Sequence, residues 1–185
     1  MKRLSRTLLG ALMAMTLGVP ASAALALASS AASTPAPCAA SALATSLGQS
    51  SGAAGTEYVT LRITSHVKGT NALTGWCTLS GTPATQFGVP EGVVFRSVGP
   101  AATKLTFAGR GKTVVIKPGA VASVTIGIET AQNFAPSKCQ TANVSRVRLI
   151  FKSGAQLFYT LPRTQVCTKL ASTTTSGVVL GTRYP

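Results

Sequence analysis

The chain has 185 residues, of which 17 are lysine or arginine and only three are acidic, so its formal net charge at pH 7 is +14. Aspartate is absent, the acids are Glu57, Glu91 and Glu129, and His66 is the single histidine. This inventory argues against a Ser-His-Asp triad and against a calcium site made of several carboxylates. The positive excess predicts attraction to anionic partners and repulsion between copies of the protein, so we expect a monomer.

Residues 1–23 have the pattern of an export signal. Residues 2–6 supply three positive charges, residues 7–19 carry no charge and are largely apolar, and Ala21-Ser22-Ala23 fits the small-x-small cleavage pattern. A second such pattern, Ala26-Leu27-Ala28, leaves the exact cut open. An uncleaved membrane anchor is the alternative, which the length of the apolar stretch disfavours because a spanning helix needs about 20 residues. We therefore expect a secreted or envelope-associated protein, and a net charge of +11 once the three signal cations are removed.

A lead-in and a single domain follow the signal. Residues 24–37 are rich in Ala, Ser, Thr and Pro without periodicity, which predicts a disordered segment. The remaining residues, 38–185, have the length of one domain. At its start, residues 38–47 are compatible either with a helical turn, which the alanines favour, or with an edge strand, which the β-rich surroundings favour.

The domain contains four cysteines, Cys38, Cys77, Cys139 and Cys167, and an even number in an exported chain predicts two disulfides. Three connectivities are possible. We favour Cys38–Cys77 with Cys139–Cys167, which closes the shorter loops, and each bond would stabilise the fold by about 3–4 kcal/mol. The spacings are too wide for a Cys-x-x-Cys metal site, so we expect no metal and no other cofactor.

From Glu57 onward the sequence predicts short strands separated by turns. Val59, Leu61 and Ile63 alternate with polar residues, the pattern of a strand with one buried face. The expected strands cover residues 57–67, 75–81, 86–87, 93–98, 104–108, 113–117, 121–128, 146–152, 156–161 and 177–180. Two hairpins are expected among them, one joining 104–108 to 113–117 and one joining 146–152 to 156–161. Pro162 should confine the following residues to an edge or a loop. The spacing of the strands is typical of a β-sandwich or barrel.

Most residues that suggest chemistry have a simpler structural interpretation. His66 is expected at a strand end, and the three glutamates are far apart in sequence, so a pair of catalytic acids would require a spatial coincidence. The glycines around Arg110 lack the spacing and the following helix of a phosphate-binding loop, which favours a hairpin turn. Trp76 beside Cys77 is expected to pack in the core.

The basic residues are the strongest candidates for a functional surface. Seven of them fall in two groups: Lys104, Arg110, Lys112 and Lys117 on the first predicted hairpin, and Arg146, Arg148 and Lys152 on the second. If these elements lie adjacent, they would form a cationic surface for an anionic polysaccharide, nucleic acid or acidic lipid headgroups. The alternative is that they simply solvate exposed strands. We expect no sequence-specific nucleic-acid binding, because stacking aromatic residues are not evident.

An ordered set of motifs gives the sequence a family resemblance. It resembles an actinobacterial family of secreted domains catalogued as domain of unknown function 4232. The matching motifs are Gly52-Ala53-Ala54-Gly55, Tyr58-Val59, Leu61, Cys77-Thr78-Leu79, Gly81, Pro83, Val98-Gly99, Ile116, Pro118-Gly119, Asn133-Phe134, Leu161-Pro162 and Val166-Cys167. The resemblance implies an immunoglobulin-like β-sandwich, exported or lipid-anchored, with cysteines paired in sequence order and no established catalytic residues.

We therefore expect an all-β, immunoglobulin-like β-sandwich with two disulfides, acting outside the cytoplasm as a non-enzymatic binding or interaction module. A basic-surface binder of anionic polymers or acidic lipid headgroups is the alternative, and a hydrolase is the weakest candidate. The partner would be an anionic envelope polymer or an envelope protein.

The disulfide pairing and the export signal are testable on the secreted protein. Peptide mapping without reductant should find Cys38 linked to Cys77, Cys139 linked to Cys167 and no free thiol, and the N-terminus should lie after residue 23 or residue 28. A free thiol, a crossed linkage or a retained signal would contradict these expectations.

Overall fold

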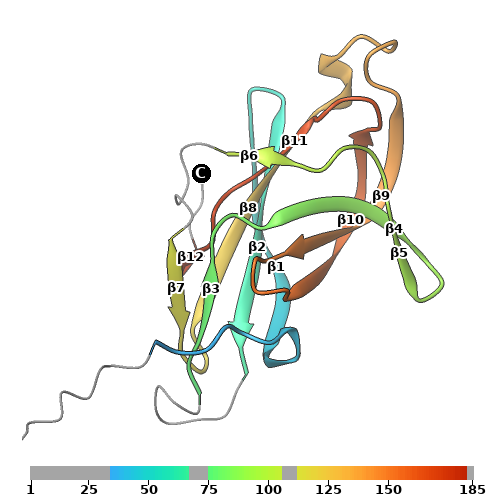
Figure 1. The fold of residues 1–185 in the computed structure, drawn as a ribbon. Coiled ribbons are helices and arrows are strands. Elements are labelled where there is room, and N and C mark those ends of the chain that lie inside the picture. The colour runs from blue at the N-terminus through green and yellow to red at the C-terminus, as the bar shows by residue number, and fades with distance from the viewer. Residues whose placement is uncertain (1–33, 67–74, 106–111, 183–185) are drawn as a thin grey trace, which may run out of the picture. The chain divides into compact units, whose positions relative to one another are not determined.

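The computed structural model describes residues 34–66, 75–105 and 112–182. Within these residues the chain is all-β, with three sheets, two short 3₁₀ helices and no α-helix (Figure 1). All of them belong to one compact unit, Ser33–Pro185. The predicted all-β class is confirmed.

The largest sheet has the strand order β1-β2-β8-β11-β6, and β12 also pairs with β8. Its strands are β1 (Leu43–Ala53), β2 (Thr56–Ser65), β6 (Thr103–Lys104), β8 (Val121–Glu129), β11 (Thr173–Thr175) and β12 (Val179–Leu180). β1 and β2 form a hairpin around Ala54 and Gly55, whose φ angles of +49° and +77° suit the mirror-image turns that follow the twist of paired strands. The apolar residues predicted to be buried in β2, Val59, Leu61 and Ile63, are all buried, and Thr60 on the opposite face is buried as well.

The ambiguous start of the domain contains both of the structures that its sequence suggested. A 3₁₀ turn, η1 (Ala40–Ala42), leads directly into β1, which then runs as an exposed edge strand to Ala53. Before η1, the last residues of the expected lead-in are held against the domain: Cys38 N–H donates to the Thr78 carbonyl, and Thr78 N–H donates to the Ala36 carbonyl, both at 2.9 Å.

Strand β8 lies in the middle of the largest sheet and is buried from Ala122 to Ile128. β2 pairs with it along nine residues on one side. On the other side, β11 pairs with residues 126–128 and β12 with residues 122–123. Ser176 fills the gap between them: its N–H donates to the Thr125 carbonyl, and its Oγ accepts from Thr125 N–H, both at 2.8 Å. The C-terminal threonine run is therefore part of the sheet.

The second sheet has four strands in the order β10-β9-β4-β5. They are β4 (Ala84–Glu91), β5 (Val94–Ser97), β9 (Thr141–Ile150) and β10 (Gln156–Cys167). The predicted hairpin between β9 and β10 is confirmed. Pro162 lies in β10 at a shift of register, and β10 is an edge strand, as expected for a residue that cannot donate to a neighbouring strand.

The third sheet pairs β3 (Cys77–Ser80) with β7 (Thr113–Ile116). This pairing corrects the described part of the other predicted hairpin, whose residues 106–108 lie outside the described residues. Thr103 and Lys104 do not pair with β7 but lie parallel to β11 in the largest sheet. Local turn residues suggested the hairpin, but the apolar face of β7 is buried against β3 instead: Val114 pairs with Leu79 and Ile116 with Cys77.

Both predicted disulfides are present, Cys38–Cys77 and Cys139–Cys167, and no described cysteine is free. The first fastens the N-terminal segment to β3, and the second fastens the loop after η2 (Ala131–Asn133) to the end of β10. Two disulfides indicate an oxidising, extracellular environment. Among the described residues, none forms a helix that is long and apolar enough to cross a bilayer.

One hydrophobic core joins the three sheets. Its fully buried side chains include Leu61, Ile63, Leu79, Phe87, Ile116, Val124, Ile126, Val147 and Leu149. Tyr159 of β10 is also buried, and its hydroxyl donates to the Arg62 carbonyl at 3.1 Å, which fastens β10 to β2. Burial raises the pKa of the Tyr159 phenol well above its usual value, because the anion would lose its hydration.

The buried phenol predicts loss of stability at high pH. Above pH 10 the unfolded chain releases the Tyr159 proton while the folded chain keeps it, so the free energy of unfolding should fall by up to about 1.4 kcal/mol per pH unit from this group. Tyr159→Phe should cost about 1 kcal/mol near neutral pH through the lost hydrogen bond but lack this alkaline decline. Urea unfolding of both proteins from pH 7 to 12 measures the difference, and parallel pH profiles would contradict the expectation.

Candidate functional site

The outer face of the four-stranded sheet carries two arginines and two phenylalanines from three strands: Phe95 of β5, Arg146 and Arg148 of β9, and Phe158 of β10. We call these four residues the aromatic–arginine face. Alternation along the strands places them there. On β10, for example, Leu157 and Tyr159 are buried, whereas Phe158 between them is 41% exposed.

A glycine on β4 makes room for Phe95 to lie across the sheet. Gly88 pairs with Arg146 of β9 on one side and with Ser97 of β5 on the other. A Cβ atom at this position would collide with the Arg96 carbonyl oxygen and would lie 2.7 Å from Cζ of Phe95. Because Gly88 has no side chain, the Phe95 ring extends over β4 toward Phe158, with ring centroids 5.8 Å apart and planes inclined by 59°.

Arg148 is held in place by its neighbours on the same face. Its Nε donates to Oε1 of Gln86 at 3.1 Å, its Nη2 donates to the same oxygen, and its guanidinium lies 4.7 Å from the centroid of the Phe95 ring. The backbone of Phe158 is held by β1, because the Thr45 hydroxyl donates to the Phe158 carbonyl at 3.1 Å. The rings and this guanidinium are therefore positioned without any ligand.

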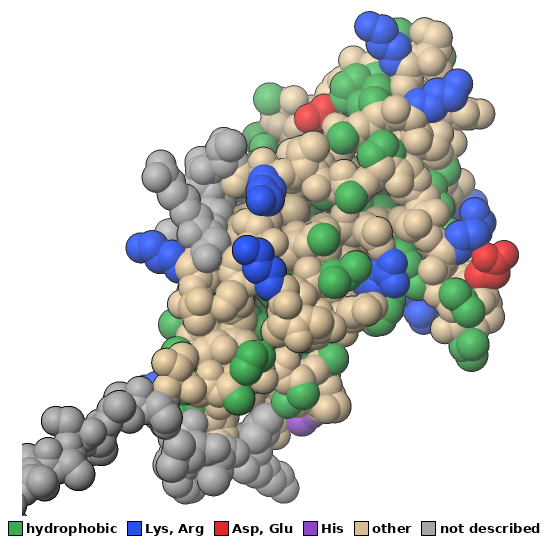
Figure 2. Space-filling model, in the orientation of Figure 1, with side chains coloured by type: hydrophobic (Ala, Val, Ile, Leu, Met, Phe, Trp, Pro, Cys, Tyr) green, Lys and Arg blue, Asp and Glu red, His purple; other side chains and the backbone are tan. Residues whose placement is uncertain are grey.

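Arg146 differs from Arg148 in having no hydrogen-bond or ion-pair partner among the described residues. It lines an open hollow of about 390 Å³ together with Val93, Phe95, Phe158 and Thr160. Val93, in the β4–β5 turn, is fully exposed. Figure 2 shows hydrophobic, basic and acidic side chains side by side where Figure 1 places the end of the β4–β5 hairpin. The hollow thus combines apolar walls with an uncompensated positive charge.

The basic residues predicted from the sequence come from elements of all three sheets. Arg146 and Arg148 lie two residues apart on β9 and share one of its faces, whereas Lys152, grouped with them from the sequence, lies in the turn beyond that strand. Lys104 is on β6 of the largest sheet, Lys112 and Lys117 flank β7 of the smallest, and Arg110 lies outside the described residues.

Trp76 also departs from its prediction. The indole is only partly buried and is not part of the hydrophobic core. Lys117 Nζ lies 4.5 Å from its ring centroid, a cation–π contact. The lone tryptophan beside the disulfide is therefore covered by a lysine at the surface.

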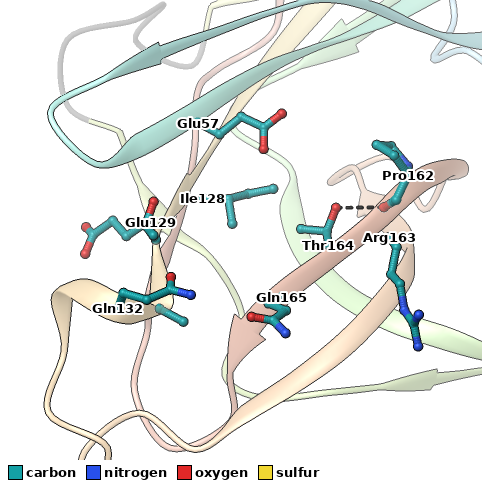
Figure 3. Close-up of a pocket in the computed structure, with 10 residues that line it drawn as sticks. Glu57, Ile128, Glu129, Gln132, Pro162, Arg163, Thr164 and Gln165 are labelled. Carbon is teal, nitrogen blue, oxygen red and sulfur yellow. Dashed lines mark hydrogen bonds between the residues drawn. The ribbon is translucent and has the colours of Figure 1, made fainter.

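A second cleft, of about 270 Å³, lies between the end of the β2–β8 pair and residues 162–165 of β10 (Figure 3). Glu57 points into it, whereas Glu129 points away. The register explains this difference, because Glu57 pairs with Ile128, and Glu129, the next residue, pairs with Thr56 on the opposite face. The two carboxylates consequently do not face each other as a catalytic pair would.

His66 lies immediately beyond β2, at the opposite end of that strand from Glu57. Its Nε2 is 2.8 Å from the Ser41 carbonyl oxygen. Glu91 forms an exposed ion pair with Arg96, at 3.2 Å. Among the described residues, the histidine and the glutamates are not brought together.

A family model described as a domain of unknown function (DUF4232) matches residues 38–179. The chain belongs to this family. Searches among curated proteins and among solved structures found no match. The DUF4232 match covers all four cysteines and every residue of the aromatic–arginine face, and it assigns no ligand.

Sequence reasoning identified the two arginines of this DUF4232 domain but missed the two phenylalanines and Gly88. Phe158 could have been found from the sequence. Leu157 and Tyr159 lie on the buried face of the strand, so alternation leaves the aromatic residue between them on the solvent-exposed face. Phe95 could not, since its position over Gly88 depends on pairing between β4 and β5.

Gly88→Ala should disturb the aromatic pair. The added methyl group meets β5 backbone and the Phe95 ring, so we expect the free energy of unfolding to fall by about 1–3 kcal/mol and the nuclear Overhauser contacts between Phe95 and Phe158 to weaken. Gly52→Ala is the matched control, because an added Cβ there meets no atom within 4 Å. Equal stability of the two variants, with the ring contacts intact, would contradict this account of Gly88.

Proposed function

We propose that this protein is a secreted, non-enzymatic module of the immunoglobulin-like β-sandwich type that binds an anionic partner through its aromatic–arginine face. The observation that carries the proposal is Arg146, an arginine without a partner among the described residues, in a hollow walled by Phe95 and Phe158.

An arginine in this setting is suited to hold an anion. The planar guanidinium donates two parallel hydrogen bonds to a carboxylate or phosphate, and its interaction with an anion strengthens where apolar walls exclude water. Arg148 and both rings are already positioned by contacts within the sheet, so less conformational freedom is lost on binding. The net charge of +11 expected after removal of the three signal cations from the +14 of the full chain would further speed the approach of an anionic partner.

Several features support the location and the fold in this proposal. The signal-peptide pattern at the N-terminus and the two disulfides both support a location outside the cytoplasm. Largely antiparallel sheets that contribute to one core, with β2 and β8 on one side of it and β4, β9 and β10 on the other, favour an immunoglobulin-like sandwich.

The positions of the titratable groups favour binding over hydrolysis. A hydrolase would need His66 or a pair of glutamates at one reaction centre. His66 and Glu57 occupy opposite ends of β2, and Glu57 and Glu129 occupy opposite faces of the sheet.

Heparin chromatography of single variants tests whether anion binding is localised. Arg146→Gln should elute at clearly lower salt than Arg163→Gln, which removes the same charge from an exposed arginine of β10 outside the face. Phe158→Ala should also elute earlier than the wild type although its charge is unchanged, because the apolar wall is lost. Equal shifts for both arginine variants, with none for Phe158→Ala, would mean that only diffuse charge acts and would overturn the proposal.

A further inference from the structure

We infer that the hollow of the aromatic–arginine face binds a carboxylated sugar unit, a uronate residue of an acidic polysaccharide. The inference rests on the proposed function, since it names the ligand of the same site.

The apolar and polar groups of the hollow lie in separate places, and so do the C–H faces and the polar edge of a pyranose ring. Phe95 and Phe158 present ring surfaces, and their planes are inclined by 59°, so they form two walls rather than one flat platform. Thr160 pairs directly with Arg146 across β10 and β9, which places a hydroxyl and a guanidinium on the same face beside those walls. A pyranose uronate has C–H groups on its ring faces and hydroxyls and a carboxylate at its edge. The C–H groups suit the negative faces of aromatic rings.

The number of charges in the hollow favours one carboxylate. Arg146 is the one cation among the described residues that lines it, whereas Arg148 is hydrogen-bonded to Gln86 and stacked on Phe95. A single guanidinium satisfies a carboxylate through paired hydrogen bonds. A single-stranded nucleic acid, by contrast, stacks successive bases on aromatic rings and follows a continuous basic groove. An acidic peptide would have to immobilise a flexible side chain, whereas a sugar ring is already rigid.

The size and openness of the hollow suit a unit within a polymer. Its volume of about 390 Å³ lies at the small end of the range for ligand sites, which is roughly 300–1,000 Å³. The exposed Val93 and Thr160 leave it open along the sheet surface. Beyond Arg146, Arg148 lies two residues further along β9, and Lys152 follows the strand, so further carboxylates of the same polymer would meet positive charge.

The test measures binding of the secreted protein to four probes by biolayer interferometry at fixed ionic strength. Polygalacturonate supplies carboxylated sugars, its fully methyl-esterified form keeps the sugars without the charge, poly-L-glutamate keeps the carboxylates without the sugars, and a single-stranded DNA oligonucleotide supplies phosphates. We expect binding to polygalacturonate at least tenfold tighter than to each of the other three.

Variants then locate the site. Arg146→Gln should weaken polygalacturonate binding about tenfold and Arg163→Gln less than twofold, while Arg146→Lys, which keeps the charge but loses the paired donors, should weaken it severalfold. Phe158→Ala should weaken it without any change in charge.

The outcomes separate the two proposals. If poly-L-glutamate or DNA binds as tightly as polygalacturonate and still depends on Arg146 and Phe158, the sugar inference is overturned and the proposed function stands. If no probe depends on these residues more than on Arg163, both are overturned.

Discussion

The described part of the molecule depends on hydrogen-bond partners for the backbone of one buried strand, β8. Ala122–Ile128 of β8 have almost no contact with water, so each backbone N–H and C=O there needs a partner in the protein. β2 provides partners on one side. The other side is completed by three separate pieces of the C-terminal segment: β11, the Ser176 backbone and hydroxyl around Thr125, and β12. This explains why a run of threonines and serines near the end of the chain lies beside the central strand.

The same core leaves the candidate site free on the opposite side of the second sheet. Because Phe87, Val147, Leu149 and Tyr159 fill the inner face, strand alternation exposes the residues between them. Most proteins put polar side chains on such a face, but here Phe95 lies over Gly88, pairs with Phe158 and stacks on Arg148. The second arginine keeps its hydrogen-bonding capacity unused among the described residues. Exposed aromatic rings beside a guanidinium without a protein partner form a surface suited to a ligand, which is why we propose binding at this face.

The sequence predicted the strands and turns that neighbouring residues determine, but it failed to predict pairing between strands that are far apart in the chain. The alternation of Val59, Leu61 and Ile63 and the turn after Lys152 were sufficient for β2 and for the β9–β10 hairpin. The four cysteines predicted the disulfides: their even number indicated two bonds, and the preference for shorter loops selected the sequential pairing. Residues 104–108 were expected to pair with residues 113–117. In the described residues Lys104 pairs with β11 and β7 pairs with β3, both far away in sequence. The basic surface was consequently divided, and Arg146 and Arg148 gained aromatic neighbours that no local pattern connects.

The location of ligand binding is measured most directly by a nuclear magnetic resonance titration of the isotope-labelled protein with trigalacturonate. The account predicts that the largest chemical-shift changes fall on Phe95, Arg146, Phe158 and Thr160, and that they saturate together with one dissociation constant. Changes spread evenly over Lys104, Lys112, Lys117 and Lys138, or centred on the cleft beside Glu57, would contradict it.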